Sequence, residues 1–138
     1  MITPTKKLNQ EIILMNNKWL ILSVGGILGT FLRYLVSTWV PEFTGTGFPY
    51  GTWVVNLTAC LIVGVLAGMT SRGALRPNAR LLLMTGFCGA YSTFSTWILE
   101  TSNLADNGEM MRAGANLIGN LGAGLVFYRI GVLIGTMV

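Results

Sequence analysis

The sequence contains few charged residues and no histidine. Asp, Glu, Lys and Arg make up 10% of its 138 residues, whereas hydrophobic residues make up 52%. A soluble domain carries about 25% charged residues, because a folded chain in water needs a polar shell. The missing shell excludes an ordinary soluble fold. The composition therefore predicts a membrane protein, with residues 1–138 forming a single domain.

Ligands for a catalytic metal ion are also missing. The two cysteines, Cys60 and Cys88, both lie inside apolar segments. A zinc site takes about four ligands, usually Cys and His, so the thiols are interpreted as small packing residues. The net charge of +4 comes from basic residues that flank apolar stretches and do not form a patch for nucleic acid. We therefore expect that the protein is not an enzyme, that it has no catalytic residues and that it does not bind nucleic acid.

Four apolar segments are long enough to cross a membrane, and they cover about residues 19–40, 51–69, 81–99 and 113–136. A helix needs roughly 17–25 residues to cross the hydrocarbon core. None of the segments alternates with the period of two that a barrel strand requires. The sequence therefore predicts an all-α, multi-pass protein of the cell (plasma or inner) membrane. We expect the third helix to be broken near its middle. Two glycines, Gly86 and Gly89, also loosen this helix.

Glycines four residues apart predict close packing between helices, within one subunit or between two. Three segments carry such a pair: Gly25 with Gly29, Gly64 with Gly68, and Gly131 with Gly135. Charges in the connections predict the orientation. Six cations lie on the side of the N-terminus, namely Lys6, Lys7, Lys18, Arg72, Arg76 and Arg80, whereas Arg112 lies on the other side. The positive-inside rule then places both termini in the cytoplasm.

Acidic residues are absent from the four segments, and Glu100 is expected at the border of the third. Proton-coupled exporters usually bind protons and cations on a buried carboxylate, and many cation pores use rings of acids. The sequence therefore disfavours both classes.

Neutral hydrogen-bond donors take the place of acids inside the membrane. Between Thr85 and Trp97 six residues carry a hydroxyl group, namely Thr85, Tyr91, Ser92, Thr93, Ser95 and Thr96. Asn56 lies in the second segment, and Asn116 and Asn120 lie in the fourth. An amide in hydrocarbon is costly unless it is hydrogen-bonded, so each Asn is either a contact between helices or a donor in a transport path. An acid-free lining rich in donors suits an anion that must lose its water.

Three stretches of this sequence resemble the signatures of the Fluc (CrcB) family of fluoride channels. They are residues 25–34 (GGILGTFLRY), 51–56 (GTWVVN) and 86–96 (GFCGAYSTFST). The resemblance implies a fluoride-selective channel that exports cytoplasmic fluoride passively and so lowers its toxicity. It also implies an antiparallel, dual-topology homodimer of four-helix subunits, with a sodium ion buried at the dimer centre.

The resemblance also assigns roles to individual residues. Gly89 and Ser92 would offer backbone carbonyls to the sodium ion. Phe94 would present the positive edge of its ring to fluoride, and Arg33 would attract anions in an aqueous vestibule. The other residues expected along the pore are Asn56, Thr93, Ser95, Thr96, Trp97, Asn116 and Asn120. The chain departs from the family pattern at three of these, because Trp97 replaces a Phe, Asn116 a Tyr and Asn120 a Ser.

Two other functions remain open on the sequence alone. One is a small multidrug-type exporter, which is also a dimer of four-helix chains but needs a buried carboxylate. The other is a membrane assembly subunit without transport activity, in which the polar residues only hold helices together. For the dimer, the biased charges also allow an oppositely oriented homologous subunit as the partner.

Overall fold

The computed structural model describes the backbone of residues 4–138 and the side chains from residue 17 onward. Every regular element in this range is helical, which confirms the all-α prediction. The elements are α1 (Pro4–Thr44), α2 (Tyr50–Ser71), α3 (Pro77–Arg80), η1 (Leu81–Cys88), α4 (Gly89–Tyr91), α5 (Phe94–Asp106), α6 (Met110–Gly114), η2 (Ala115–Gly119) and α7 (Asn120–Met137), where η marks a π-helical stretch.

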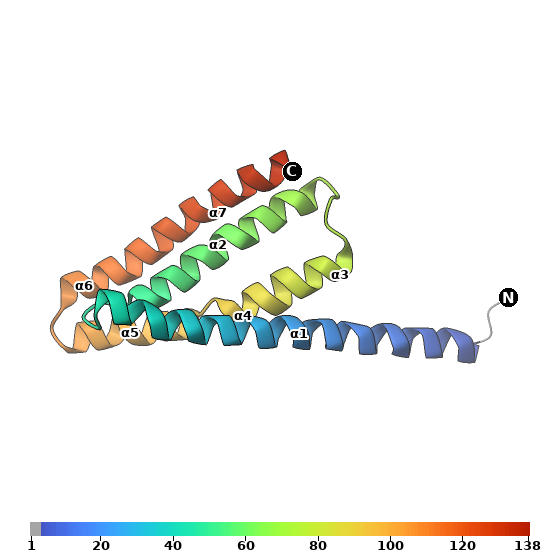
Figure 1. Cartoon of the computed structure of the whole chain (residues 1–138), viewed down its shortest axis with the longest axis horizontal. Helices are drawn as coiled ribbons and strands as arrows, with labels where there is room; N and C mark the ends of the chain where they lie inside the picture. The colour runs from blue at the N-terminus through green and yellow to red at the C-terminus, as the bar shows by residue number, and fades with distance from the viewer. Residues whose placement is uncertain (1–3) are drawn as a thin grey trace.

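Within the described chain, three stretches are long and apolar enough to span a membrane: Asn17–Thr44, Tyr50–Ser71 and Met110–Met137. The remaining stretch, from α3 to α5, passes between the same two ends of the molecule in separate pieces (Figure 1). The chain is thus a multi-pass membrane protein, as predicted.

The first helix is longer at both ends than the predicted range of 19–40, because it runs from Pro4 to Thr44. At about 1.5 Å per residue its 41 residues extend about 61 Å, twice the thickness of a hydrocarbon core. The predicted end at about residue 40 is wrong, because Pro41 lies inside the helix. One further turn forms because the Pro41 carbonyl accepts a hydrogen bond from the Gly45 N–H at 2.8 Å. The helix stops at Gly45, whose φ of +79° is a conformation that glycine adopts without strain.

The helices pack as two pairs that run side by side. α1 lies along η1 and α4, and α2 lies along α7 (Figure 1). The N-terminal end of α1, the connection from α2 to α3 and the C-terminus lie at one end of the molecule. The connections from α1 to α2 and from α5 to α6 lie at the other end. Both termini are therefore on the same side, as four crossings require.

The glycine pairs pack within the chain. A Cβ atom on Gly64 would lie 2.3 Å from the carbonyl oxygen of Tyr128, and one on Gly131 would lie 2.3 Å from that of Leu61. In the other helix pair, a Cβ on Gly25 would lie 2.4 Å from the Leu82 carbonyl. These distances are far below van der Waals contact, so only glycine lets the backbones approach this closely. Of the two locations that the sequence allowed, the structure selects packing within one subunit.

Candidate functional site

Helical structure is interrupted between α4 and α5. Ser92 and Thr93 are extended, with ψ angles of 158° and 116°. The Thr93 hydroxyl caps the new helix, because its Oγ1 accepts from the Thr96 N–H at 3.3 Å and donates to the Thr96 Oγ1 at 2.8 Å. The hydroxyl-rich stretch of the sequence therefore ends one helix and starts another, and Ser92–Thr93 is called the break below.

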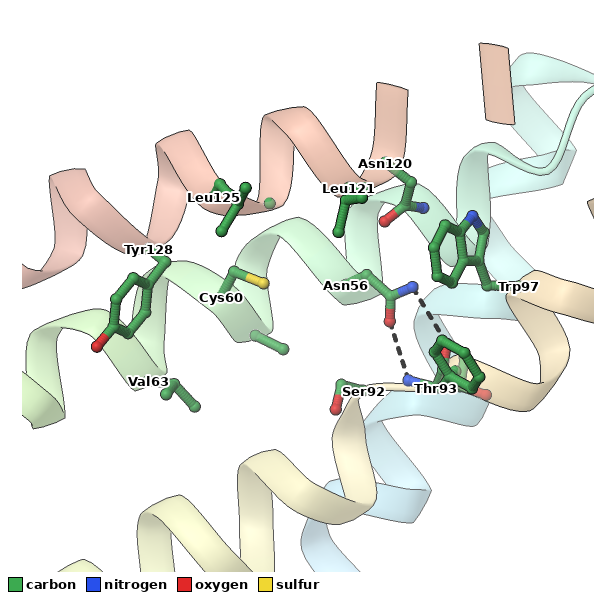
Figure 2. Close-up of a pocket in the computed structure, with 13 residues that line it drawn as sticks. Asn56, Cys60, Val63, Ser92, Thr93, Trp97, Asn120, Leu121, Leu125 and Tyr128 are labelled. Atoms are coloured by element: carbon green, nitrogen blue, oxygen red, sulfur yellow. Dashed lines mark hydrogen bonds between the residues drawn. The ribbon is translucent and has the colours of Figure 1, made fainter. Parts of the chain in front are cut away.

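Asn56 on α2 binds both backbone groups of Thr93. Its Oδ1 accepts from the Thr93 N–H at 2.9 Å, and its Nδ2 donates to the Thr93 carbonyl at 3.2 Å (Figure 2). In a continuous α-helix the Thr93 N–H would donate to the carbonyl of Gly89, four residues earlier. Asn56 therefore satisfies backbone groups that would be costly to leave unpaired, and it leaves the Gly89 carbonyl without its helical donor.

An open pocket of about 370 Å³ lies between α2, the break and α7 (Figure 2). We call it the neutral pocket, because none of its lining residues carries a charge. They are Asn56, Ala59, Cys60 and Val63 from α2, Ser92, Thr93, Phe94 and Trp97 from the break and α5, and Asn120, Leu121, Gly124, Leu125 and Tyr128 from α7. The walls are mainly apolar, and apart from the Tyr128 hydroxyl at the opposite end, the polar side chains gather toward the end that holds the break.

Two amides supply donors at that end of the pocket. Asn120 is 6% exposed, and its buried Nδ2 has no hydrogen-bond partner among the described residues. An amide nitrogen carries two N–H donors, and the Nδ2 of Asn56 uses one of them on Thr93. A buried donor without a partner costs free energy. The pocket is therefore suited to a small hydrogen-bond acceptor, and an anion is one such acceptor.

Two aromatic rings stand beside these amides. The ring centroids of Phe94 and Trp97 are 5.4 Å apart with an interplanar angle of 72°, so one ring meets the other edge-on. Trp97 is buried, whereas Phe94 is 71% exposed in the single chain. Ring edges carry partial positive charge. The aromatic pair can thus add weak electrostatic attraction for an anion without adding a hydrogen-bond donor.

Not all of the predicted pore residues meet at this pocket. Ser95 and Thr96 are exposed on α5 and do not line it. Asn116 is fully buried in η2, away from the pocket, and is hydrogen-bonded to side chains of α2 and α5. The structure brings together Asn56, Thr93, Phe94, Trp97 and Asn120.

Arg33 and the two residues predicted to bind sodium lie near the break. Arg33 is half-buried on α1, and its Nη1 lies 3.5 Å from the carbonyl oxygen of Ser92. Gly89 is exposed. The Ser92 hydroxyl donates to the Cys88 carbonyl at 3.0 Å and makes no hydrogen bond to the carbonyl of Ser92 itself.

Three residues of the pocket that the sequence did not predict are Cys60, Gly124 and Tyr128. Gly124 and Tyr128 follow the predicted Asn120 at intervals of four residues on α7, and Cys60 follows the predicted Asn56 by four residues on α2. Residues with this spacing lie on one face of a helix. The spacing was a usable signal for the lining, although it does not say which helices face one another.

Glu100 does not lie at the border of the third helix, where the sequence predicts it. Because α5 continues to Asp106, Glu100 lies in mid-helix and is half-buried. Its Oε1 accepts from the Thr52 hydroxyl at 2.8 Å, and its Oε2 is buried without a hydrogen-bond partner in the described chain. A carboxyl group is therefore present in the helix bundle, but it does not line the neutral pocket.

The fold and the site define a small, all-helical membrane protein with an uncharged, donor-bearing pocket beside a helix break. Comparison with known proteins agrees with this class. Residues 20–132 match the family described as CrcB-like protein, Camphor Resistance (CrcB). The chain therefore belongs to the CrcB family.

Relatives of this chain carry a more specific description. The fluoride-specific ion channel FluC of Chlorobaculum tepidum is 42% identical over 119 residues, which cover 86% of this chain and 94% of the relative. The fluoride-specific ion channel FluC of Acidobacterium capsulatum is 38% identical over 122 residues, which cover 88% and 98% of the two chains. The similarity thus extends over nearly the whole length of both relatives.

Proposed function

We propose that this chain forms a fluoride-selective channel that exports cytoplasmic fluoride passively across the cell membrane. The observation that carries the proposal is the neutral pocket, in which the buried Nδ2 of Asn120 has no partner and no acid is present. Membership of the CrcB family and the description of both relatives support the same function.

Selectivity for fluoride follows from the chemistry of the lining. A small anion holds its water tightly, so it enters a largely apolar site only where fixed donors replace that water. The amides of Asn56 and Asn120 are such donors, and the ring edges of Phe94 and Trp97 add partial positive charge. Chloride is larger and holds its water less tightly than fluoride, so we propose that a path completed by a second subunit around these fixed donors excludes it.

Passive transport is sufficient for this task. Hydrogen fluoride crosses membranes as a neutral molecule, dissociates in the cytoplasm and is trapped there as the ion. A channel returns the ion down its gradient without an energy source. A channel performs no covalent chemistry, and a lining without charged residues suits such a protein.

The transport path is proposed to need a second subunit. Phe94 is 71% exposed in the single chain, and the neighbouring Ser95 and Thr96 are also exposed. Donors and an aromatic ring on an outer face suit a path that a second copy completes. We propose an antiparallel homodimer, with an oppositely oriented homologous subunit as the alternative partner.

A sodium ion at the dimer centre fits the oxygens near the break. Sodium is a hard cation, and such ions prefer oxygen ligands. The Gly89 carbonyl has lost its helical donor to Asn56, and the carbonyl of Ser92 precedes the extended Thr93. These two carbonyls would hold the ion, which would tie the subunits together. Arg33, close to the Ser92 carbonyl, is proposed to attract anions to a vestibule beside this position.

The two other functions fit the geometry less well. A multidrug-type exporter needs a carboxylate facing its substrate, whereas Glu100 faces Thr52 and lies outside the neutral pocket. An assembly subunit needs polar groups only as contacts between helices, which leaves the free donor of Asn120 without a purpose.

Flux measurements on liposomes that contain the purified protein test the proposal. We expect rapid fluoride efflux and no chloride efflux above that of protein-free liposomes. A proton gradient should not change the fluoride flux beyond its effect on the driving force. Comparable fluxes of both anions, or transport of a cationic drug driven by protons, would contradict the fluoride channel.

A further inference from the structure

Three hydrogen bonds form a closed ring behind the wall of the neutral pocket. The indole Nε1 of Trp97 donates to the backbone carbonyl of Asn116 at 2.9 Å. The Asn116 Nδ2 donates to the Thr101 Oγ1 at 2.8 Å, and the Thr101 hydroxyl donates to the carbonyl of Trp97 at 2.8 Å. The ring closes on the residue where it began. The two hydrogen bonds that share the Thr101 hydroxyl polarise and strengthen one another in a low-dielectric interior.

A second indole fixes the remaining polar atom of Asn116. The Nε1 of Trp53 on α2 donates to the Asn116 Oδ1 at 2.7 Å. Asn116 is 0% exposed, and its side-chain amide and its backbone carbonyl all have partners. It therefore joins α2, α5 and η2 at one point. In a buried position this satisfied network holds its members in one arrangement, because breaking any bond leaves a buried polar group unpaired.

The ring of hydrogen bonds decides what Trp97 offers to the pocket. An indole has a single N–H donor, and that of Trp97 is consumed by Asn116 outside the pocket lining. What remains toward the pocket is the carbon edge and face of the ring, beside Asn56 and Asn120 (Figure 2). The polar groups of the Trp97 and Asn116 side chains are thus bonded to Asn116, Thr101 and Trp53, outside the pocket lining.

We propose that Asn116 and Thr101 are positioning residues that hold Trp97 as a rigid wall of the fluoride path, so that the wall sets selectivity for fluoride over chloride. The inference rests on the proposed channel function. The indole held by the hydrogen bonds meets Phe94 edge-on, with the two ring centroids 5.4 Å apart. In the proposed path, a wall that cannot rotate would not move aside to admit the larger anion. Asn116 thus acts through Trp97 and not by contact with fluoride.

The valine and serine variants of Thr101 form a matched pair for the test. Thr101 is half-buried and does not line the pocket. Thr101→Val keeps the side-chain shape but removes two of the three hydrogen bonds, whereas Thr101→Ser keeps the hydroxyl. In liposomes we expect T101V to pass chloride above the protein-free background, so that its ratio of fluoride to chloride flux falls at least about threefold below the lower bound that the wild type sets. Each lost hydrogen bond changes an equilibrium by a few-fold. T101S should keep the ratio of the wild type.

A spectroscopic measurement separates this inference from the channel function. The chain has four tryptophans, so protein labelled with 5-fluorotryptophan gives few ¹⁹F resonances, and Trp97→Phe assigns that of Trp97. We expect T101V to shift or broaden this resonance and T101S to leave it unchanged. If T101V does not purify as a folded protein, Thr101→Ala removes the same hydroxyl.

The outcomes are distinct. A wild-type protein that passes no fluoride would overturn the proposed function, whereas an unchanged Trp97 resonance in T101V would overturn the positioning role. A changed resonance with an unchanged flux ratio would show that the ring only stabilises the fold, and would overturn the link to selectivity. The inference stands if the resonance and the ratio both change in T101V and neither changes in T101S.

Discussion

The Oδ1 of Asn56 replaces the backbone acceptor that the Thr93 N–H would have in a continuous helix, and the Asn56 Nδ2 adds a donor to the Thr93 carbonyl. The sequence predicted that this residue is a buried donor, but 37 positions separate it from Thr93, and residue spacing along one segment says nothing about contacts of that range. The same limit applies to Asn116. Its amide was equally well explained as a pore donor or as a contact between helices, and only the positions of Trp53 and Thr101 separate the two.

Asn56→Asp tests whether the neutral charge of the pocket matters. Aspartate keeps an acceptor for the Thr93 N–H but loses the donor to the Thr93 carbonyl and places a negative charge in the lining. Two like charges about 4 Å apart repel by about 4 kcal/mol at an effective dielectric constant of about 20. Each 1.4 kcal/mol is about tenfold, so we expect fluoride flux to fall by roughly three orders of magnitude. Efflux from liposomes measures the effect.

Asn103→Asp is the matched control, because Asn103 is exposed on α5 outside the pocket. It introduces the same charge and should keep the wild-type flux. Normal flux through a folded N56D protein would assign Asn56 to packing alone, and equal losses in both variants would point to a general effect of the added charge.

At the scale of the elements, the sequence predicted the number and order of the helical stretches better than their ends. Hydrophobic length marks a membrane crossing, but it does not report where helix hydrogen bonds continue into polar sequence, as they do in α1 before residue 19. The π-helical stretches η1 and η2 were not predicted. They depend on how one helix meets its neighbour, as η1 meets α1 at Gly25 and Gly29, and no local residue pattern encodes that contact.

Gly131→Ala tests the close contact between α2 and α7. The new methyl group would lie 2.3 Å from the Leu61 carbonyl oxygen, and the helices must separate to admit it. Overpacking of this kind costs about 1–3 kcal/mol, which exceeds the roughly 1 kcal/mol by which alanine favours a helix over glycine. We expect a lower midpoint of thermal unfolding, as measured by circular dichroism in detergent micelles.

Gly122→Ala on the same helix provides the opposite expectation. No atom lies within 4 Å of a Cβ atom at Gly122, so only the gain in helix propensity remains, and the midpoint should stay the same or rise. If the midpoint of thermal unfolding falls equally in both variants, the close contact between α2 and α7 is not the reason for the loss of stability in Gly131→Ala.

At the scale of the whole molecule, the distribution of charge opposes the proposed assembly. The end that carries both termini also carries Arg72, Arg76 and Arg80, whereas Arg112 lies at the other end. Loop cations set the direction of insertion, so most copies should insert with both termini in the cytoplasm. An antiparallel homodimer nevertheless needs copies in both directions. The homodimer can persist if contacts between subunits stabilise the rare inverted copies. Because all pocket residues are present in this one chain, we favour the homodimer over pairing with an oppositely oriented homologous subunit.

Labelling of a single cysteine decides between these assemblies. Asn107 lies in the connection between α5 and α6, at the end opposite the termini, and is exposed. In a background with Cys60→Ala and Cys88→Ala, Asn107→Cys should react with a membrane-impermeant maleimide mainly from outside intact cells that express only this chain. A second fraction should react only after the cells are opened, because an antiparallel homodimer holds one copy in each direction. Arg76→Cys, in the connection between α2 and α3 at the other end of the molecule, should react mainly after the cells are opened and to a smaller extent from outside. Complete labelling of Asn107→Cys from outside, together with full fluoride flux in the same cells, would contradict the antiparallel homodimer.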